Sequence, residues 1–97
     1  MDCEFELQGL RFVADSDKAR ANVARHGIDF EQAAQVFFDP FFRIVDASVE
    51  DEARDAAVGY DLIGRLLFVV HIEIEGEAIR LISARGATSQ EREEHDS

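Results

Sequence analysis

A single proline, Pro40, separates two parts of the sequence that have different hydrophobic patterns. Before it, apolar residues recur at the i, i+3, i+4, i+7 spacing of a buried helix face, namely Phe30, Ala33, Ala34 and Phe37. After it, short apolar runs alternate with polar residues, which is typical of strands. Because the two patterns are segregated along the chain, the sequence predicts an α+β fold in which helices pack on one face of a twisted antiparallel sheet.

Two N-terminal helices and one short C-terminal helix are predicted. The first covers residues 18–26, with capping side chains in residues 15–17 and Gly27 as a left-handed terminator. The second covers residues 29–38 and ends at an Asp-Pro pair. The third covers residues 88–95, where a threonine is followed three residues later by a glutamate, the pattern of a capping box.

Strand patterns lie before and after the two N-terminal helices. Residues 5–13 alternate weakly around a Gln-Gly pair and predict one or two short strands or a hairpin. After the proline, an antiparallel sheet of three or four strands is predicted from residues 41–45, 56–63, 66–75 and 79–84. The helices are expected to pack on this sheet.

The last two strands are predicted to form a hairpin with its turn at residues 75–76. If the hairpin closes symmetrically about that turn, Val70 faces Leu81 on an apolar side. On the other side His71 then faces Arg80, which is interpreted as a cross-strand pair.

Composition limits the class of protein. The 97 residues, 46 % of them apolar, predict a single domain over residues 1–97. One cysteine excludes an intrachain disulfide, and no histidine spacing fits a structural zinc site, so neither a metal nor a cofactor is expected. The longest apolar run, residues 66–70, is too short to span a membrane, and the acidic N-terminus has no apolar leader, so a cytoplasmic location is expected.

The charge is strongly negative, since 21 acidic residues stand against 10 lysines and arginines for a net charge of −11. A negative surface repels phosphate backbones, and direct DNA binding is not expected. The acids are unevenly spread, however, with six in residues 46–61 and four in residues 91–96 but none in residues 79–84. A local cationic site within an acidic body is therefore compatible with the sequence.

Several side chains are of the types that cleave a phosphodiester through its 2′-hydroxyl. Such a site needs a group that takes a proton, a group that gives one, and cations that hold the charge on the phosphate oxygens. Candidates of these types are Lys18, His26, Glu52, Arg54, Arg80 and Arg85. No spacing among them forms a motif, and each also has a structural interpretation. Glu52 and Arg54 fit a surface ion pair, and the stripe of Lys18, Asn22, Arg25 and His26 fits the solvated face of a helix.

The order of these residues resembles that of the BrnT-type toxins over nearly the whole chain. The most specific part is the pattern Arg-x-Ile-Ser-Ala-Arg-x-Ala-Thr-x-x-Glu-Arg at residues 80–92. Earlier matching positions include Asp15-Ser16-Asp17-Lys18, Asn22, Arg25-His26-Gly27-Ile28, Phe30-Glu31, Asp39-Pro40, Glu52-Ala53-Arg54 and Gly59.

The resemblance implies a small ribonuclease toxin of a type II toxin–antitoxin pair, with a RelE-like fold. Such toxins cut RNA without a metal and are neutralised by a BrnA-like antitoxin, a dimeric DNA-binding protein. The family's functional positions fall on Lys18, His26, Glu52, Arg54, Arg80 and Arg85. Within this set we assign Glu52 or His26 as the base and the three arginines as the phosphate clamp, and we add Lys18 and Arg25 as RNA-binding residues.

The sequence departs from the family pattern at its C-terminal end. A basic residue usually follows the Ser-Ala-Arg triplet, and Gly86 stands there instead, which removes a cation beside Arg85. His95 stands where the pattern usually ends in tyrosine. A histidine at this position is a candidate general acid, because imidazole titrates near neutral pH.

Two other functions fit the same residues. The first is a catalytically degenerate, acidic interaction module of the same fold, which binds a basic protein partner without cleaving RNA. The second, which follows from charge alone, is a protein that mimics nucleic acid in order to block a basic protein. The family pattern explains more residues than the charge does, so the ribonuclease interpretation ranks first.

Overall fold

The computed structural model describes residues 1–74 and 76–97, so Glu75, which the sequence analysis placed at the hairpin turn, lies outside the described residues. In chain order the elements are β1 (Asp2–Leu7), β2 (Leu10–Asp15), α1 (Ser16–His26), α2 (Phe30–Ala34), the 3-10 helix η1 (Gln35–Phe38), β3 (Arg43–Asp46), β4 (Asp55–Tyr60), β5 (Leu66–Ile74), β6 (Ala78–Gly86) and α3 (Ser89–Asp96). Within the described part of the chain, no helix is both long and apolar enough to cross a membrane.

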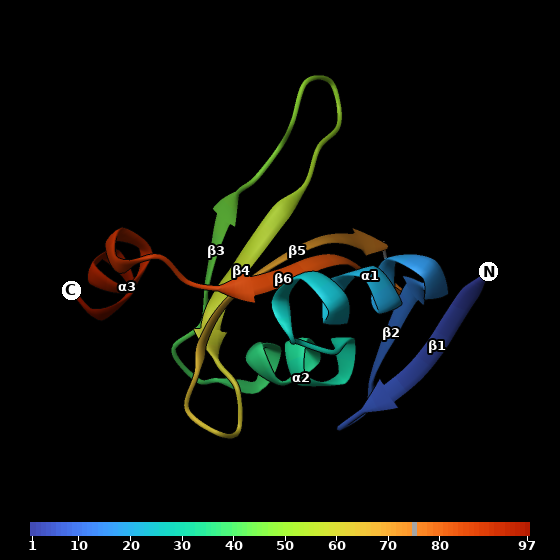
Figure 1. Cartoon of the computed structure of the whole chain (residues 1–97), viewed down its shortest axis with the longest axis horizontal. Helices are drawn as coiled ribbons and strands as arrows, with labels where there is room; N and C mark the ends of the chain where they lie inside the picture. Colours follow the sequence, from blue (N-terminus) through green and yellow to red (C-terminus); the bar gives the residue numbers. More distant parts are fainter. Residues whose placement is uncertain (75) are drawn as a thin grey trace.

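The strands form one six-stranded mixed sheet in the order β1-β2-β6-β5-β4-β3 (Figure 1). Neighbouring strands are antiparallel except β2 and β6, which run parallel, with Phe12 beside Ile79 and Val13 beside Arg80. The predicted architecture, two N-terminal helices on a three- to four-stranded antiparallel sheet, is therefore wrong. A hairpin precedes the helices and completes the sheet through this parallel contact, a long-range pairing that leaves no local signal in the sequence.

The predicted capping side chains begin the helices, but the second predicted helix, residues 29–38, is divided into α2 and the 3-10 helix η1. Asp15 caps α1 by accepting a hydrogen bond from the Lys18 amide, and Gly27, at φ +69°, ends it in the left-handed conformation. Asp29 caps α2, whose buried Phe30, with its neighbours, packs on the sheet. The main core lies between α2, η1 and the sheet, and its largest fully buried side chains are Phe12, Ile28, Val36, Leu67, Val69 and Leu81.

The pairing of β5 with β6 differs from the predicted register. His71 lies opposite Leu81, one position away from the prediction. Its buried ring packs edge-on against Phe37 and lies 3.1 Å from the Val69 carbonyl, so the predicted His71–Arg80 pair does not form. Ile74 pairs with Ala78 and not with Glu77, and a slip of one residue exchanges the two faces of a strand.

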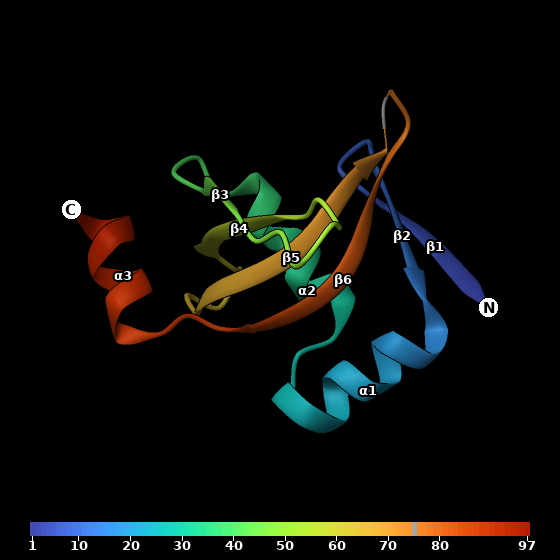
Figure 2. The ribbon, with the colours of Figure 1, turned by 90° about the horizontal axis from the view of Figure 1, so that it is seen from above.

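A bulge then shifts the register of the same hairpin a second time. His71 pairs with Leu81 but Val70 pairs with Ser83, which leaves Ile82 as the extra residue of β6. An extra residue bends the strand and changes the direction of the side chains that follow. α1 passes alongside β6 (Figure 2), and its Asn22 bonds the amide of Ala84, two residues after the bulge.

Candidate functional site

Asn22 fixes α1 to the sheet. Its side-chain oxygen accepts a hydrogen bond from the Ala84 amide at 3.0 Å, and its side-chain nitrogen donates to the Ala84 carbonyl at 2.9 Å. The same nitrogen donates to the Ile28 carbonyl at 2.9 Å, which joins the start of the α2 segment to this point. Asn22 is only 5 % exposed, so the interpretation of its stripe as a solvated face is wrong at this position.

A cavity of about 320 Å³, which we call the α1 cavity, lies beside this anchor. Its lining includes Lys18, Arg25 and His26 from α1, Ile82 and Ser83 from β6, and Arg54 from the end of the loop between β3 and β4. Four of the eight residues selected from the sequence therefore meet in one place. The lining contains no carboxylate, although the whole chain carries a net charge of −11.

The bulge in β6 helps to shape the α1 cavity. Consecutive residues of a regular strand point to opposite faces. Ile82 and Ser83 nevertheless both line the α1 cavity, at the position where the register shifts. Bulges commonly redirect side chains beside functional sites. Ser83 was not among the selected residues, and only the pairing register reveals its place.

Arg54 is the most enclosed cation of the α1 cavity, with its side chain 22 % exposed. One end of its guanidinium bonds the Glu52 carboxylate at 3.0 Å, so the predicted ion pair of these two residues is present. Its Nε atom is buried and has no hydrogen-bond partner among the described residues. A buried donor without an acceptor is costly, and a bound oxyanion would supply one.

Arg80 does not line the α1 cavity. Its guanidinium donates two hydrogen bonds, at 3.2 and 2.9 Å, to the two carboxylate oxygens of Asp2 in β1. Hydrogen bonding to Arg80 lowers the pKa of the Asp2 carboxyl below its ordinary value. The structure thus places this predicted phosphate ligand in an ion pair that ties β1 to β6.

Arg85 is likewise engaged elsewhere. Its guanidinium makes two hydrogen bonds of 2.7 and 2.8 Å to the carboxylate of Glu91 and lies 4.1 Å above the centre of the Phe68 ring. The hydrogen bonds from Arg85 lower the pKa of Glu91 to about 2. Arg85 thereby holds the start of α3 against the sheet.

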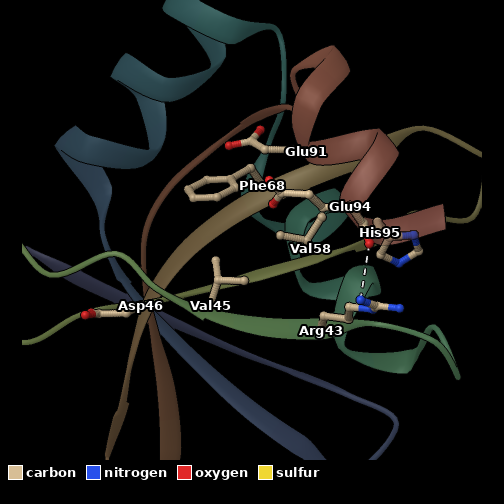
Figure 3. A pocket seen from close by; sticks show the side chains of 8 residues that line it. All are labelled: Arg43, Val45, Asp46, Val58, Phe68, Glu91, Glu94 and His95. Atoms are coloured by element: carbon tan, nitrogen blue, oxygen red, sulfur yellow. Dashed lines mark hydrogen bonds between the residues drawn. The ribbon is translucent and has the colours of Figure 1, made fainter. Parts of the chain in front are cut away.

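His95 lies on α3, apart from the α1 cavity. Its ring packs edge-on against Tyr60, with Nε2 at 3.1 Å from the Phe41 carbonyl and Nδ1 at 3.1 Å from the Asp96 carboxylate. Hydrogen bonding to His95 lowers the pKa of Asp96. His95 borders a second cavity of about 350 Å³, which we call the α3 groove (Figure 3).

The candidates selected from the sequence thus occupy three places. Lys18, Arg25, His26 and Arg54, with Glu52 bound to the last, gather at the α1 cavity. Arg80, on β6, is paired with Asp2 of β1. Arg85, also on β6, is paired with Glu91 of α3, and His95 is itself a residue of α3. Asn22 is a residue whose importance sequence reasoning missed. A usable signal was its position beside Ala19 and Val23, which are apolar residues of the same helix.

Comparisons with known proteins agree on one family. The family described as "Ribonuclease toxin, BrnT, of type II toxin-antitoxin system" matches residues 15–91. The crystal structure of the ribonuclease toxin BrnT of Brucella abortus is similar in fold, with a TM-score of 0.61 and 23 % sequence identity over 78 % of this chain and 94 % of that one. A search of curated proteins gave no significant match.

Proposed function

The chain belongs to the BrnT family of ribonuclease toxins of type II toxin–antitoxin systems, and we propose that it cleaves RNA at the α1 cavity. The observation that carries this proposal is the convergence of Lys18, Arg25, His26 and Arg54 on one cavity whose lining has no carboxylate. Such a site attracts the phosphate of a single RNA linkage even though the body of the protein is acidic.

The residues of the α1 cavity supply the base and the cations that this reaction needs. His26 takes the proton of the 2′-hydroxyl as the 2′-oxygen attacks phosphorus. The bond from phosphorus to the 5′-oxygen then breaks, and a water molecule gives that oxygen its proton, which leaves a 2′,3′-cyclic phosphate on the other fragment. Lys18, Arg25 and Arg54 hold the charge that develops on the phosphate oxygens.

Glu52 acts as a positioning residue in this proposal. Its carboxylate oxygen Oε1 lies 3.0 Å from the terminal nitrogen Nη2 of Arg54 in an ion pair. The buried Nε of Arg54 is therefore left to donate to a phosphate oxygen. Of the two bases considered from the sequence, His26 is favoured because it lines the α1 cavity itself. No step of the proposed reaction requires a metal ion.

The membership of a type II system implies a protein antitoxin as partner and RNA as substrate. We extend this to a BrnA-like antitoxin that is dimeric and binds DNA, and to action in the bacterial cytoplasm. The net charge of −11 favours a basic segment of that antitoxin as the part that touches the toxin.

One observation favours the alternative of a non-catalytic interaction module. Arg80 and Arg85 are each bonded by two hydrogen bonds to a carboxylate, so neither is available to a phosphate in this conformation. Under this alternative the chain binds its antitoxin but leaves RNA intact.

Cleavage of a synthetic single-stranded RNA by the purified chain, in the presence of a chelator, tests the proposal. We expect cyclic-phosphate products from the wild type and a loss of about 100-fold in kcat/KM for Arg54→Gln, as for removal of one charge-stabilising donor. Arg20→Gln is the matched control, because Arg20 lies on α1 with an exposed side chain that pairs with Asp17. RNA that stays intact beside a tight complex with the antitoxin would select the interaction module instead.

A further inference from the structure

The outer edge of β3 (Arg43–Asp46) pairs with no other strand in the described part of the chain, because β3 is the last strand of the sheet. The Ala47 amide donates to the Arg54 carbonyl at 3.0 Å, which marks these two as a hydrogen-bonded pair between the strands. Such pairs alternate along an antiparallel ladder. The main-chain groups of Ile44 and Asp46 therefore point outward, toward the open edge.

The two edges of the sheet differ in their protection. At the other edge, β1 carries charged side chains along its length, including Glu4 and Glu6, and such side chains discourage the addition of a further strand. β3 carries charges only at its two ends, Arg43 and Asp46. The β3 edge is bordered by apolar side chains that are exposed, with Phe41 at 76 %, Ile44 at 49 % and Val45 at 39 %. An open edge bordered by exposed apolar residues is typical of a site where another strand adds.

The α3 groove adjoins this edge. Val45, Val58 and Phe68 form its apolar floor, and Glu91 and Glu94 project from α3 above them (Figure 3). Asp46 stands at its other end, on β3 itself. Side chains of an added strand alternate between the two faces of a sheet, so every second residue of such a strand would lie over the groove.

Charge indicates what kind of strand fits. The loop that follows β3 carries acidic residues at positions 50, 51 and 52, and the groove is lined by Asp46, Glu91 and Glu94 against one arginine, Arg43. A second copy of the chain would bring another net charge of −11 to this surface. A basic segment is attracted to it, and complementary charge speeds association and fixes the register of binding.

We propose that the β3 edge and the α3 groove together form the docking site for a basic, strand-forming segment of the antitoxin. Main-chain groups of that segment pair with those of Ile44 and Asp46. Its alternate apolar side chains enter the α3 groove, and its lysines or arginines face Asp46 and Glu94. This inference rests on the proposed function only because the partner is taken to be an antitoxin.

Titration calorimetry with a purified BrnA-like antitoxin tests the main-chain contact. Ile44→Pro removes one outward amide without touching the pairing of β3 with β4. We expect Kd to rise about tenfold or more, which corresponds to the loss of about 1.4 kcal/mol. Glu6→Pro is the matched control, because Leu7 and Leu10 close the hairpin and the amide of Glu6 therefore points outward on the β1 edge. The Kd of this variant is expected to equal that of the wild type.

A second pair of variants tests the charge. Glu94→Gln removes a carboxylate from the groove, and Glu31→Gln removes one from an exposed position on α2. Both change the net charge equally, so weaker binding by Glu94→Gln alone supports the groove as the binding surface. Equal effects of the two variants, or an unchanged Kd for Ile44→Pro, would overturn the proposal.

Two further outcomes separate this proposal from others. If the chain alone sediments as a dimer that Ile44→Pro dissociates, the occupant of the edge is a second copy and the proposal fails. RNA cleavage by Ile44→Pro is expected at the wild-type rate, because Ile44 does not line the α1 cavity. If the wild type does not cleave RNA while Ile44→Pro still weakens antitoxin binding, the proposed function fails and the docking site stands.

Discussion

At the scale of single residues, Asn22 performs the role of a strand's peptide group. β2 pairs with β6 only at Ile79 and Arg80, so the rest of that edge of β6 needs other partners for its main-chain N–H and C=O groups. The side-chain amide of Asn22 presents one N–H donor and its oxygen acceptor to β6 in the arrangement of a peptide, and it bonds both main-chain groups of Ala84. One side chain therefore satisfies the sheet edge and sets the position of α1 over it.

Asn22→Ala is expected to lower the free energy of unfolding by about 3 kcal/mol, because buried main-chain groups of Ala84 and Ile28 lose their partners. Urea unfolding followed by circular dichroism measures this loss. Arg20→Ala, an exposed change on the same helix, is expected to cost less than about 0.5 kcal/mol. Similar unfolding free energies for the two variants would contradict the role assigned to Asn22.

At the scale of elements, α3 depends on a few polar contacts at its start. None of its residues is buried. Thr88 and Glu91 form the predicted capping box, with the Glu91 amide 3.1 Å from the Thr88 hydroxyl, and Glu91 also bonds Arg85 through both carboxylate oxygens. At the other end of α3 the His95 ring packs against Tyr60, so the charge of Glu91 controls the docking of the start of the helix.

The pH dependence of this contact follows from the pKa of Glu91, which hydrogen bonding to Arg85 lowers from 4.5 to about 2. A lowered carboxyl pKa means that the stabilising contact is complete above the ordinary value of 4.5 and is lost as the pH falls toward 2. A carboxyl NMR titration is expected to give Glu91 a midpoint of about 2, and Arg85→Gln is expected to move it up toward 4.5. A midpoint near 4.5 in the wild type would show that the pair does not form in solution.

The elements themselves were predictable where the signal is local. Capping residues and helical spacing predicted α1 and α3 to within a few residues, and the hairpin of β1 and β2 is one of the two structures that the Gln-Gly pair predicted for residues 5–13. The register of β5 and β6 was not predictable, because the bulge at Ile82 depends on how β6 fits between β5 and α1. That bulge is also what brings Ser83 to the α1 cavity.

At the scale of the whole molecule, the sequence could not predict which distant segments meet. The parallel pairing of β2 with β6 joins residues more than sixty positions apart, and no local pattern encodes it. The same holds for the candidate site. Residue types and motif order selected Arg54, Arg80 and Arg85 together, but tertiary structure places them in three surroundings. Each arginine is paired with a carboxylate, Arg54 through one terminal nitrogen and the other two through two hydrogen bonds each.

The balance between the acidic body and the cationic cavity gives a prediction about salt. In this proposal the three lysine and arginine side chains of the α1 cavity contact RNA phosphates. Each such contact with a single strand contributes about −0.7 to the slope of the logarithm of the binding constant against the logarithm of the salt concentration. We therefore expect a slope of about −2. Fluorescence anisotropy of a labelled RNA with the His26→Gln variant measures this slope. Binding that strengthens with added salt would show that repulsion by the whole molecule dominates.

The central claim, that RNA is cut at the α1 cavity, is tested most directly by comparing the two histidines that the sequence put forward. We measure single-turnover cleavage of one synthetic RNA by His26→Gln and by His95→Gln, each checked for folding by thermal melting. His26→Gln is expected to be slower by about 100-fold or more, as for loss of a general base, and His95→Gln is expected to cleave at the wild-type rate. Loss of cleavage in His95→Gln, with His26→Gln still active, would contradict the claim and move the site to the α3 groove.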